Sequence, residues 1–173
     1  MKYLSALVAL ATMLLPGRAF SQQKKPIEHD DVSRWKSIEQ PRISDDGNWI
    51  AWTQAPVTEG DPVLYVREAS TGKTQVFPRA ANAVFTEDAR SLVFRINPPF
   101  DTIKAMRRRK VKDEQLPKDS LAVLTLSTGA LKKMPNLKSF TVPEKWSGWL
   151  FYQIEPGGPE AMKKDSSETA SPD

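Results

Sequence analysis

Few residues in this 173-residue chain have side chains suited to catalysis. It has one histidine, His29, followed directly by Asp30 and Asp31, and it has no cysteine. A histidine held by an acid supports nucleophilic catalysis only where it reaches an activated serine, and no Gly-x-Ser-x-Gly sequence provides one. The absence of cysteine excludes disulfides, thiolate metal sites and a thiol nucleophile. We therefore expect no catalytic, cofactor or metal site, and we interpret His29 as a solvated or capping residue.

Two acidic pairs are candidate metal ligands, Asp45-Asp46 and Glu87-Asp88. The Asp-Asp-Gly-Asn pattern at the first pair lacks the spaced oxygen ligands of a calcium loop. Short acidic side chains also accept hydrogen bonds from the backbone of their own turn. We interpret both pairs as turn residues.

The segment 97–117 is basic and could contact an anionic partner, such as acidic lipid headgroups or nucleic acid. No aromatic residue lies between its cations to stack on bases, which disfavours nucleic acid. We favour a solvated helical or irregular insertion between strands. The cations are Lys104, Arg107, Arg108, Arg109, Lys110 and Lys112.

The five tryptophans could stack on sugars, but packing is the simpler interpretation. Trp35 is expected to fill a core position. The other four fall at corresponding positions of predicted strands, which favours packing between sheets; these are Trp49, Trp52, Trp146 and Trp149.

The elements that position these residues form a repeat. Ile43–Thr53 returns later in the chain as Phe85–Arg95, each copy reading apolar, hydroxyl, two acidic positions, turn and apolar strand. Leu64–Lys73 returns as Leu121–Ala130 at a larger offset, so the second copy carries an insertion. A repeat of about 40 residues is typical of stacked supersecondary units.

A short helix is expected before the first copy, capped by Asp30 or Asp31, passing through Val32, Trp35 and Ile38, and ended by Pro41. The predicted strands of the first copy are Trp49–Thr53, Val63–Glu68 and Thr74–Phe77, ended by Pro78. In the second copy they lie within Ala83–Arg95 and at Leu121–Leu126 and Leu131–Met134, ended by Pro135. The third copy begins at Ser139 and offers the strand Trp149–Gln153.

Short strands at this spacing indicate an all-β fold, a partial β-propeller of about two and a third blades. The predicted organisation runs in chain order: a signal peptide at 1–21, a polar entry segment with the short helix at 22–40, and blade 1 at 41–78. Blade 2 follows at 79–135 with the insertion 97–117, then the start of blade 3 at 136–155 and a disordered tail at 156–173.

The segment 1–21 has the features of a signal peptide. Lys2 precedes the apolar run Leu4–Leu15, which is too short to span a bilayer, and small residues flank Phe20. We predict export to the periplasm or beyond, cleavage after Ser21, and no transmembrane segment in the mature chain. Loss of Lys2 and Arg18 would lower the formal charge from +4 to +2, too little to indicate nucleic acid as a partner.

The turn Ser44–Asn48 followed by Trp49–Trp52 resembles the TolB-type propeller repeat. Arg34–Ile38, followed by Pro41–Ser44, is similar to the start of the propeller in exported serine peptidases of the prolyl oligopeptidase family. The likeness covers roughly residues 28 to 155 and continues through Val84–Asp88, Leu92–Arg95 and Leu116–Leu121. In that family the propeller caps an α/β-hydrolase domain with a serine–aspartate–histidine triad and restricts substrates to short peptides.

The resemblance implies a non-catalytic N-terminal propeller portion of such a peptidase, which acts on peptides through a hydrolase domain that this sequence lacks. No catalytic or binding residue is carried over. The alternative is a genuine short exported module of β-repeats, which binds a peptide, a protein or a second copy at an open sheet edge. The sequence does not decide between a truncated product and a short protein.

Overall fold

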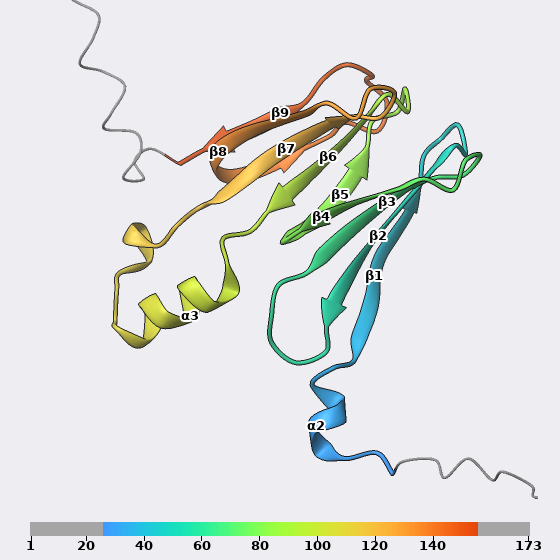
Figure 1. Ribbon diagram of the computed structural model, residues 1–173. Coiled ribbons are helices and arrows are strands. Elements are labelled where there is room, and N and C mark those ends of the chain that lie inside the picture. Colours follow the sequence, from blue (N-terminus) through green and yellow to red (C-terminus); the bar gives the residue numbers. More distant parts are fainter. Residues whose placement is uncertain (1–25, 156–173) are drawn as a thin grey trace, which may run out of the picture.

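The computed structural model describes residues 26–155 as two antiparallel sheets, shown side by side in Figure 1. The first sheet has the order β1-β2-β3-β4 and the second β5-β6-β7-β8-β9, so within each sheet every strand pairs with its neighbours in sequence. This architecture confirms the predicted all-β class and partial β-propeller. The strands of the first sheet are β1 (Lys36–Ile43), β2 (Trp49–Pro56), β3 (Val63–Glu68) and β4 (Thr74–Pro78).

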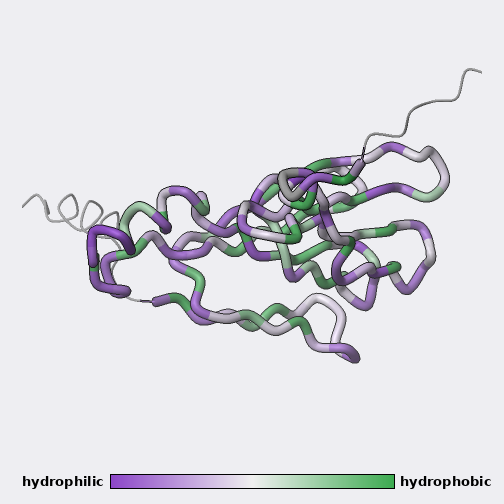
Figure 2. Tube along the Cα trace, turned by 90° about the horizontal axis from the view of Figure 1, so that it is seen from below, coloured by the Kyte–Doolittle hydropathy of each residue, from purple (hydrophilic) through white to green (hydrophobic). Residues whose placement is uncertain are grey.

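The second sheet holds β5 (Ala80–Phe85), β6 (Ser91–Ile96), β7 (Asp119–Thr125), β8 (Leu131–Thr141) and β9 (Phe151–Ile154). A short helix, α2 (His29–Val32), precedes β1. Between β6 and β7 the chain leaves the sheet to form α3 (Phe100–Arg108) and a 3-10 turn, η1 (Asp113–Gln115). Apolar residues concentrate along the strands, whereas the insertion and the turns at the strand ends are mostly hydrophilic (Figure 2).

The two sheets pack face to face around one apolar core. Ala51 and Leu64 of the first sheet meet Leu92 and Phe94 of the second, and all four side chains are fully buried. The Phe77 and Phe94 rings lie 5.0 Å apart at their centroids. Burial of side chains of this size contributes about 2 kcal/mol each, so this contact fixes how the sheets sit against each other.

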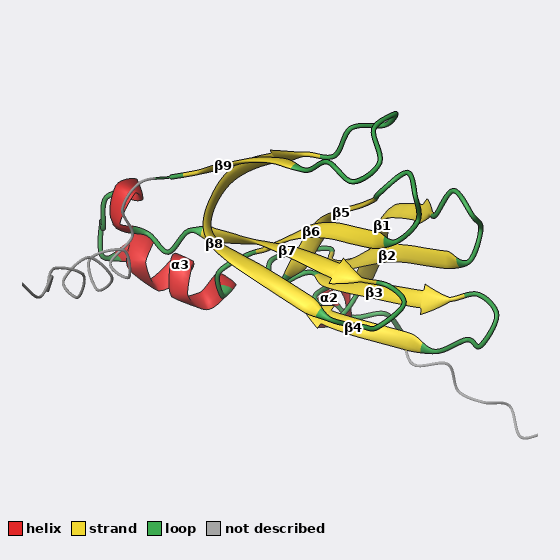
Figure 3. Ribbon diagram, turned by 90° about the horizontal axis from the view of Figure 1, so that it is seen from above, coloured by secondary structure: helices red, strands yellow, loops and turns green. Residues whose placement is uncertain are grey.

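Strand β8 belongs to two repeats, because its first half pairs with β7 and its second half, from Leu137, pairs with β9. The strand curves strongly between the halves (Figure 3). The second half turns Leu137 and the neighbouring Phe140 towards Val93 and Leu121, on the face of the second sheet that looks away from the first. The third repeat therefore begins by covering the second, as the second covers the first.

The prediction that Pro135 ends a strand is wrong. Pro135 lies inside β8, where the pairing register with β7 shifts. A bulge removes one ladder hydrogen bond, so a residue without an N–H group is tolerated there.

The predicted helix through Val32, Trp35 and Ile38 is also wrong beyond its first turn. The helix ends at Val32, and Lys36–Ile43 forms β1 instead, paired with β2. Pro41 falls in the bulge between Glu39 and Arg42 of that strand. Apolar spacing at every third or fourth position suggested a helix, but pairing with β2 satisfies the backbone of this segment and overrides the pattern. The first sheet thus begins at residue 36, before the predicted boundary at 41.

Trp35 is 50% exposed, so the prediction that it fills the core is wrong. It precedes β1, where its carbonyl accepts a hydrogen bond from the Val57 backbone N–H at 3.0 Å. The predicted signal peptide at 1–21 and the tail 156–173 lie outside the described residues, as do the side chains of His29 and Asp30. Within residues 26–155 no helix has the length and apolar character needed to cross a membrane.

We predict that Phe94→Ala destabilises the chain by about 4 kcal/mol, because it leaves a cavity where the two sheets meet. The control is Phe151→Ala in β9, where the ring is 52% exposed. We expect that control to change the free energy of unfolding by about 0.5 kcal/mol or less. Urea denaturation of the full chain measures both, and equal effects would contradict the assigned core.

Candidate functional site

The insertion 97–117 forms the wall of a cavity, and two contacts fix α3 to the loop between β2 and β3. Asp61 of that loop accepts a hydrogen bond from the Phe100 backbone N–H at 2.9 Å. This bond satisfies one of the amide groups that a helix leaves open in its first turn. One helical turn later, Lys104 forms an ion pair with Glu59 of the same loop and lies 5.3 Å from the centre of the Phe100 ring. The Lys104 ammonium donates a hydrogen bond to the Glu59 carboxylate, and this bond lowers the pKa of Glu59.

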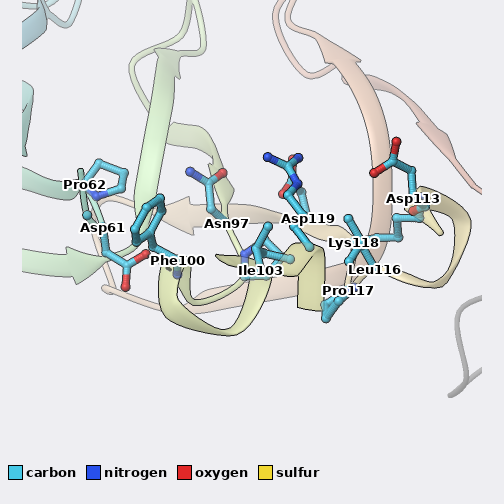
Figure 4. Close-up of a pocket in the computed structure, with 13 residues that line it drawn as sticks. Asp61, Pro62, Asn97, Phe100, Ile103, Asp113, Leu116, Pro117, Lys118 and Asp119 are labelled. Carbon is cyan, nitrogen blue, oxygen red and sulfur yellow. Dashed lines mark hydrogen bonds between the residues drawn. The ribbon is translucent and has the colours of Figure 1, made fainter. Parts of the chain in front are cut away.

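The cavity has a volume of about 430 Å³ and lies between α3, the loop 57–62 and the segment leading into β7. In Figure 4, Phe100 and Ile103 lie between Asp61 on one side and Leu116 and Lys118 on the other. Leu116 is buried and provides an apolar floor. Asn97 and Pro117 complete the cavity together with the residues around them.

Most charges on the cavity rim already have partners. Lys118 Nζ lies 2.8 Å from Glu155 and donates to the Asp113 carbonyl oxygen at 3.2 Å. The hydrogen bond from Lys118 lowers the pKa of Glu155. Arg95 pairs with Asp119 at 2.8 Å. Among residues 26–155, these pairs leave Arg107 as the cation that lines the cavity without an ion-pair partner.

The arrangement could hold a small group with an apolar part and a negative charge, because an apolar floor faces one unpaired guanidinium. It contains no histidine or serine placed for proton transfer or nucleophilic attack. Within the described part of the chain, no group of three His, Cys, Asp or Glu side chains is placed to hold a metal ion.

The predicted helical or irregular insertion is confirmed by α3 and η1. Lys104 is held by Glu59, whereas the remaining basic side chains are exposed and have no ion pair in the described chain. An anionic contact at this surface stays a prediction. The exposed cations are Arg107, Arg108, Arg109, Lys110 and Lys112.

The acidic pairs lie in turns, as predicted, but only the second acid of each pair accepts the hydrogen bonds that hold the turn together. Ser44 donates its hydroxyl to Asp46 at 2.5 Å, and the same carboxylate oxygen accepts from the Asn48 backbone N–H at 3.1 Å. Asp46 therefore bridges the hydroxyl and the backbone of its own turn. These bonds, led by that from Ser44, lower the pKa of Asp46.

The second copy repeats this network. Thr86 donates to Asp88 at 2.6 Å, and Asp88 accepts from the Arg90 backbone N–H at 3.1 Å. The Thr86 bond is the largest cause of the lowered pKa of Asp88. The hydroxyl–x–Asp spacing is the sequence signal that separates the second acid from the first, whereas Asp45 and Glu87 are exposed and make no hydrogen bond seen among residues 26–155.

The tryptophans divide into two groups. Trp49 packs against the core, and Trp52 stacks on Tyr65 with ring centroids 5.3 Å apart. The prediction of packing between sheets is wrong for Trp146 and Trp149, which are 64% and 61% exposed in the loop before β9. Only the start of a third repeat follows them in the described chain, so no further sheet face covers their rings.

Sequence reasoning missed Asp61 and Phe100, which fix α3 in place. They lie 39 residues apart, in the β2–β3 and β6–β7 connections, which hold the same place in the two repeats but differ in length and sequence. No periodic pattern joins them, so only the folded chain reveals their contact.

We predict that Asp61→Ala costs about 1 kcal/mol of local helix stability, because the Phe100 N–H loses its acceptor. Hydrogen exchange of the α3 amides should become faster by the corresponding factor, about fivefold. The control is Glu114→Ala in η1, an exposed acid that makes no bond to α3 in the structure. Unchanged exchange in the Asp61 variant would contradict the capping role.

We predict that Thr86→Val raises the pKa of Asp88 towards its ordinary value of 3.8, because the largest cause of the lowered pKa is removed. A lowered pKa stabilises the fold above about pH 4, and that stabilisation is lost as the pH falls through the folded-state pKa. The variant should therefore lose less of its stability on acidification. Carboxyl NMR titration measures the shift, with Asp46 in the same molecule as the control; movement of both carboxyls together would refute the local cause.

Comparisons with known proteins found no family model and no curated protein that matches the sequence. Solved structures do match. The chain is similar to an acylaminoacyl peptidase of Pyrococcus horikoshii, with a TM-score of 0.48 and 13% identity over 69% of this chain and 17% of that one. It is also similar to the β-propeller domain of the Trilobed protease of Pyrococcus furiosus, with a TM-score of 0.47 and 15% identity over 68% and 34%.

A structure described as a prolyl endopeptidase matches more of this chain, 92%, at 11% identity and a TM-score of 0.38, and 26% of its own length is covered. The chain thus spans between a sixth and a third of the length of these solved proteins. At such identities and scores, the assignment of the fold rests on the strand order and the repeated turns of the chain itself. All three are described as peptidases or a protease, and one of them is described as a β-propeller domain.

Proposed function

We propose that this chain forms the first blades of a β-propeller in an exported serine peptidase of the prolyl oligopeptidase family. In that role it is the non-catalytic gate that admits short peptides to a hydrolase domain. The sequence motifs that resemble this family support the proposal, as do the repeated turns. The observation that carries it is an apolar sheet face that has no neighbouring sheet.

That face belongs to the first sheet and looks away from the second. Ile50 and Trp52 lie on it, and they correspond to Leu92 and Phe94 of the next repeat. Leu92 and Phe94 are fully buried because the first sheet covers them. In the described chain no sheet covers Ile50 and Trp52. If the packing of the repeat continues, one more sheet packs on this face of the first sheet.

The cross-strand neighbours make the same face broadly apolar. Ile43 pairs with Ile50, and Val76 pairs with Tyr65, the ring that stacks on Trp52. Directly paired residues point to the same side of a sheet. Large exposed apolar surfaces mark sites of association, and a further blade of a closed ring would cover this one.

The experiment is to sequence the coding locus beyond the codon for Asp173 and to express the whole open frame. We expect further blades and a Gly-x-Ser-x-Gly hydrolase domain, and a product that cleaves short members of a peptide ladder but spares long ones. Trp52→Ala, which loosens the proposed ring contact, should admit longer peptides. Arg109→Ala, on the exposed insertion, is the control. A frame that stops at Asp173 would refute the proposal.

One observation favours the second candidate, a stand-alone interaction module. The four side chains of β9 are exposed, and β9 is the free edge of the second sheet. Such an edge accepts an added strand from a peptide or from a second copy. If the frame stops at Asp173 and the chain is a monodisperse folded species, pairing at β9 becomes the function to test.

A further inference from the structure

The first strand of each of the three repeats carries a bulge. The pairing register shifts between Glu39 and Arg42 in β1 and between Ala81 and Val84 in β5. A third shift lies between Leu137 and Ser139, in the second half of β8. When the copies are aligned on their second strands, the first two bulges are equivalent, opposite Trp52 and Phe94, and the third lies one residue further along, opposite Gln153 and Ile154.

Two of the bulges hold left-handed residues with amide side chains. Gln40 has φ 48° and Asn82 has φ 55°. This conformation is costly for residues other than glycine, and such residues cluster where a backbone is shaped for a ligand. A bulge also leaves backbone groups outside the ladder and redirects the side chain next to it.

The bulges meet around one groove. Gln40 and Asn82, the left-handed bulge residues, line a cavity of about 450 Å³ together with Ser139, which directly follows the third bulge. The side chains of Arg42 and Arg95 also line it. β1 and β5 are both edge strands, and they contact each other, so the groove runs along backbone that is paired on one side only.

The groove continues into a second cavity of about 320 Å³, which shares Arg42, Val84, Val142 and Glu144 with the first. Three acids line this end, one from each copy: Asp45, Glu87 and Glu144. None of them forms an ion pair in the described chain, and together they do not form a metal site there. Arg42 and Glu144 line both cavities, so the two ends differ in their balance of charge: two cations and one acid line the first cavity, and one cation and three acids line the second. The first cavity is the cationic end of the groove, and the second is the acidic end.

The cationic end has unused hydrogen-bonding capacity. Arg95 pairs with Asp119 and reaches the Lys138 carbonyl oxygen at 3.4 Å, but its Nε is buried without a hydrogen-bond partner in the described chain. Arg42 is exposed and forms no ion pair there. Guanidinium donors bind carboxylates and phosphates, and a carboxylate is the one of these that a peptide carries.

We propose that this bulge groove binds a short peptide with free termini in an extended conformation. The peptide backbone lies against the free edges of β1 and β5 and the amides of Gln40 and Asn82. Its α-carboxylate faces Arg42 and Arg95, and its ammonium group faces Asp45, Glu87 and Glu144. The choice of a peptide as ligand rests on the proposed function. In that function the groove would make the gate prefer peptides whose two ends are both free.

The test titrates tetra-alanine into the isotope-labelled full chain and follows the backbone NMR signals. We expect shifts in residues 39–42, 81–84 and 139–144, and weaker binding when either end of the peptide is capped. Shifts confined to β9 or to α3, or affinity indifferent to both caps, would overturn the proposal.

Two variants assign the ends. Glu144→Gln should weaken binding of the free peptide about two- to fivefold and leave the N-acetylated peptide unchanged, because an exposed ion pair of this kind is lost. Arg42→Gln should weaken binding of the free peptide by a similar factor and leave binding of the C-amidated peptide unchanged. Glu114→Gln and Arg109→Gln on the insertion are the charge-matched controls, and equal effects from the controls would refute the assignment.

The outcome is separable from that of the gate. Suppose that the enzyme expressed from the whole open frame still spares long peptides but that the groove binds no peptide. This result would refute the peptide groove and leave the proposed function standing. Peptide binding at the groove by a chain whose frame stops at Asp173 would support the peptide groove and refute the proposed function.

Discussion

Contact between apolar sheet faces is the interaction on which the rest of this structure depends. Small residues such as Ala51 and Ala122 let the sheets approach, and Phe94 fills the space between them. A sheet that is apolar on both faces needs two neighbours. The second sheet has both neighbours: the first sheet covers one of its faces, and Leu137 and Phe140 cover the other. The stacking direction, and the need for more than one repeat, follow from that requirement.

The turns and the insertion take positions that the stacking leaves free. The two Asp-bridged turns close the hairpins between the first and second strands of their repeats with the same hydrogen bonds. The insertion leaves the sheet at Ile96 and returns to the ladder at Ser120, which pairs with Ile96. A hairpin can therefore grow by a helix without disturbing the sheet, because loop closure costs little more as a loop lengthens.

The sequence predicted the features that repetition encodes. The strand Val63–Glu68, the equivalence of the turns around Asp46 and Asp88, and the all-β class follow from spacing and turn chemistry, and the structure bears them out. Strand β1 could not be found in this way, because its apolar residues are spaced as in a helix and its partner lies in the next strand. The fixing of α3 by Asp61 and the meeting of the bulges also depend on contacts between distant segments.

Strand pairing that follows chain order has a consequence for how the protein forms during synthesis. Every strand except β1 and β5, which start the two sheets, pairs with the strand made just before it, so each sheet grows through contacts between segments near in sequence. Contacts of this kind cost less chain entropy to form than contacts between distant segments. β8 adds a link between units, since one continuous strand ends the second repeat and begins the third. The second and third repeats are therefore joined through one strand, and the third cannot detach without straining the last strand of the second.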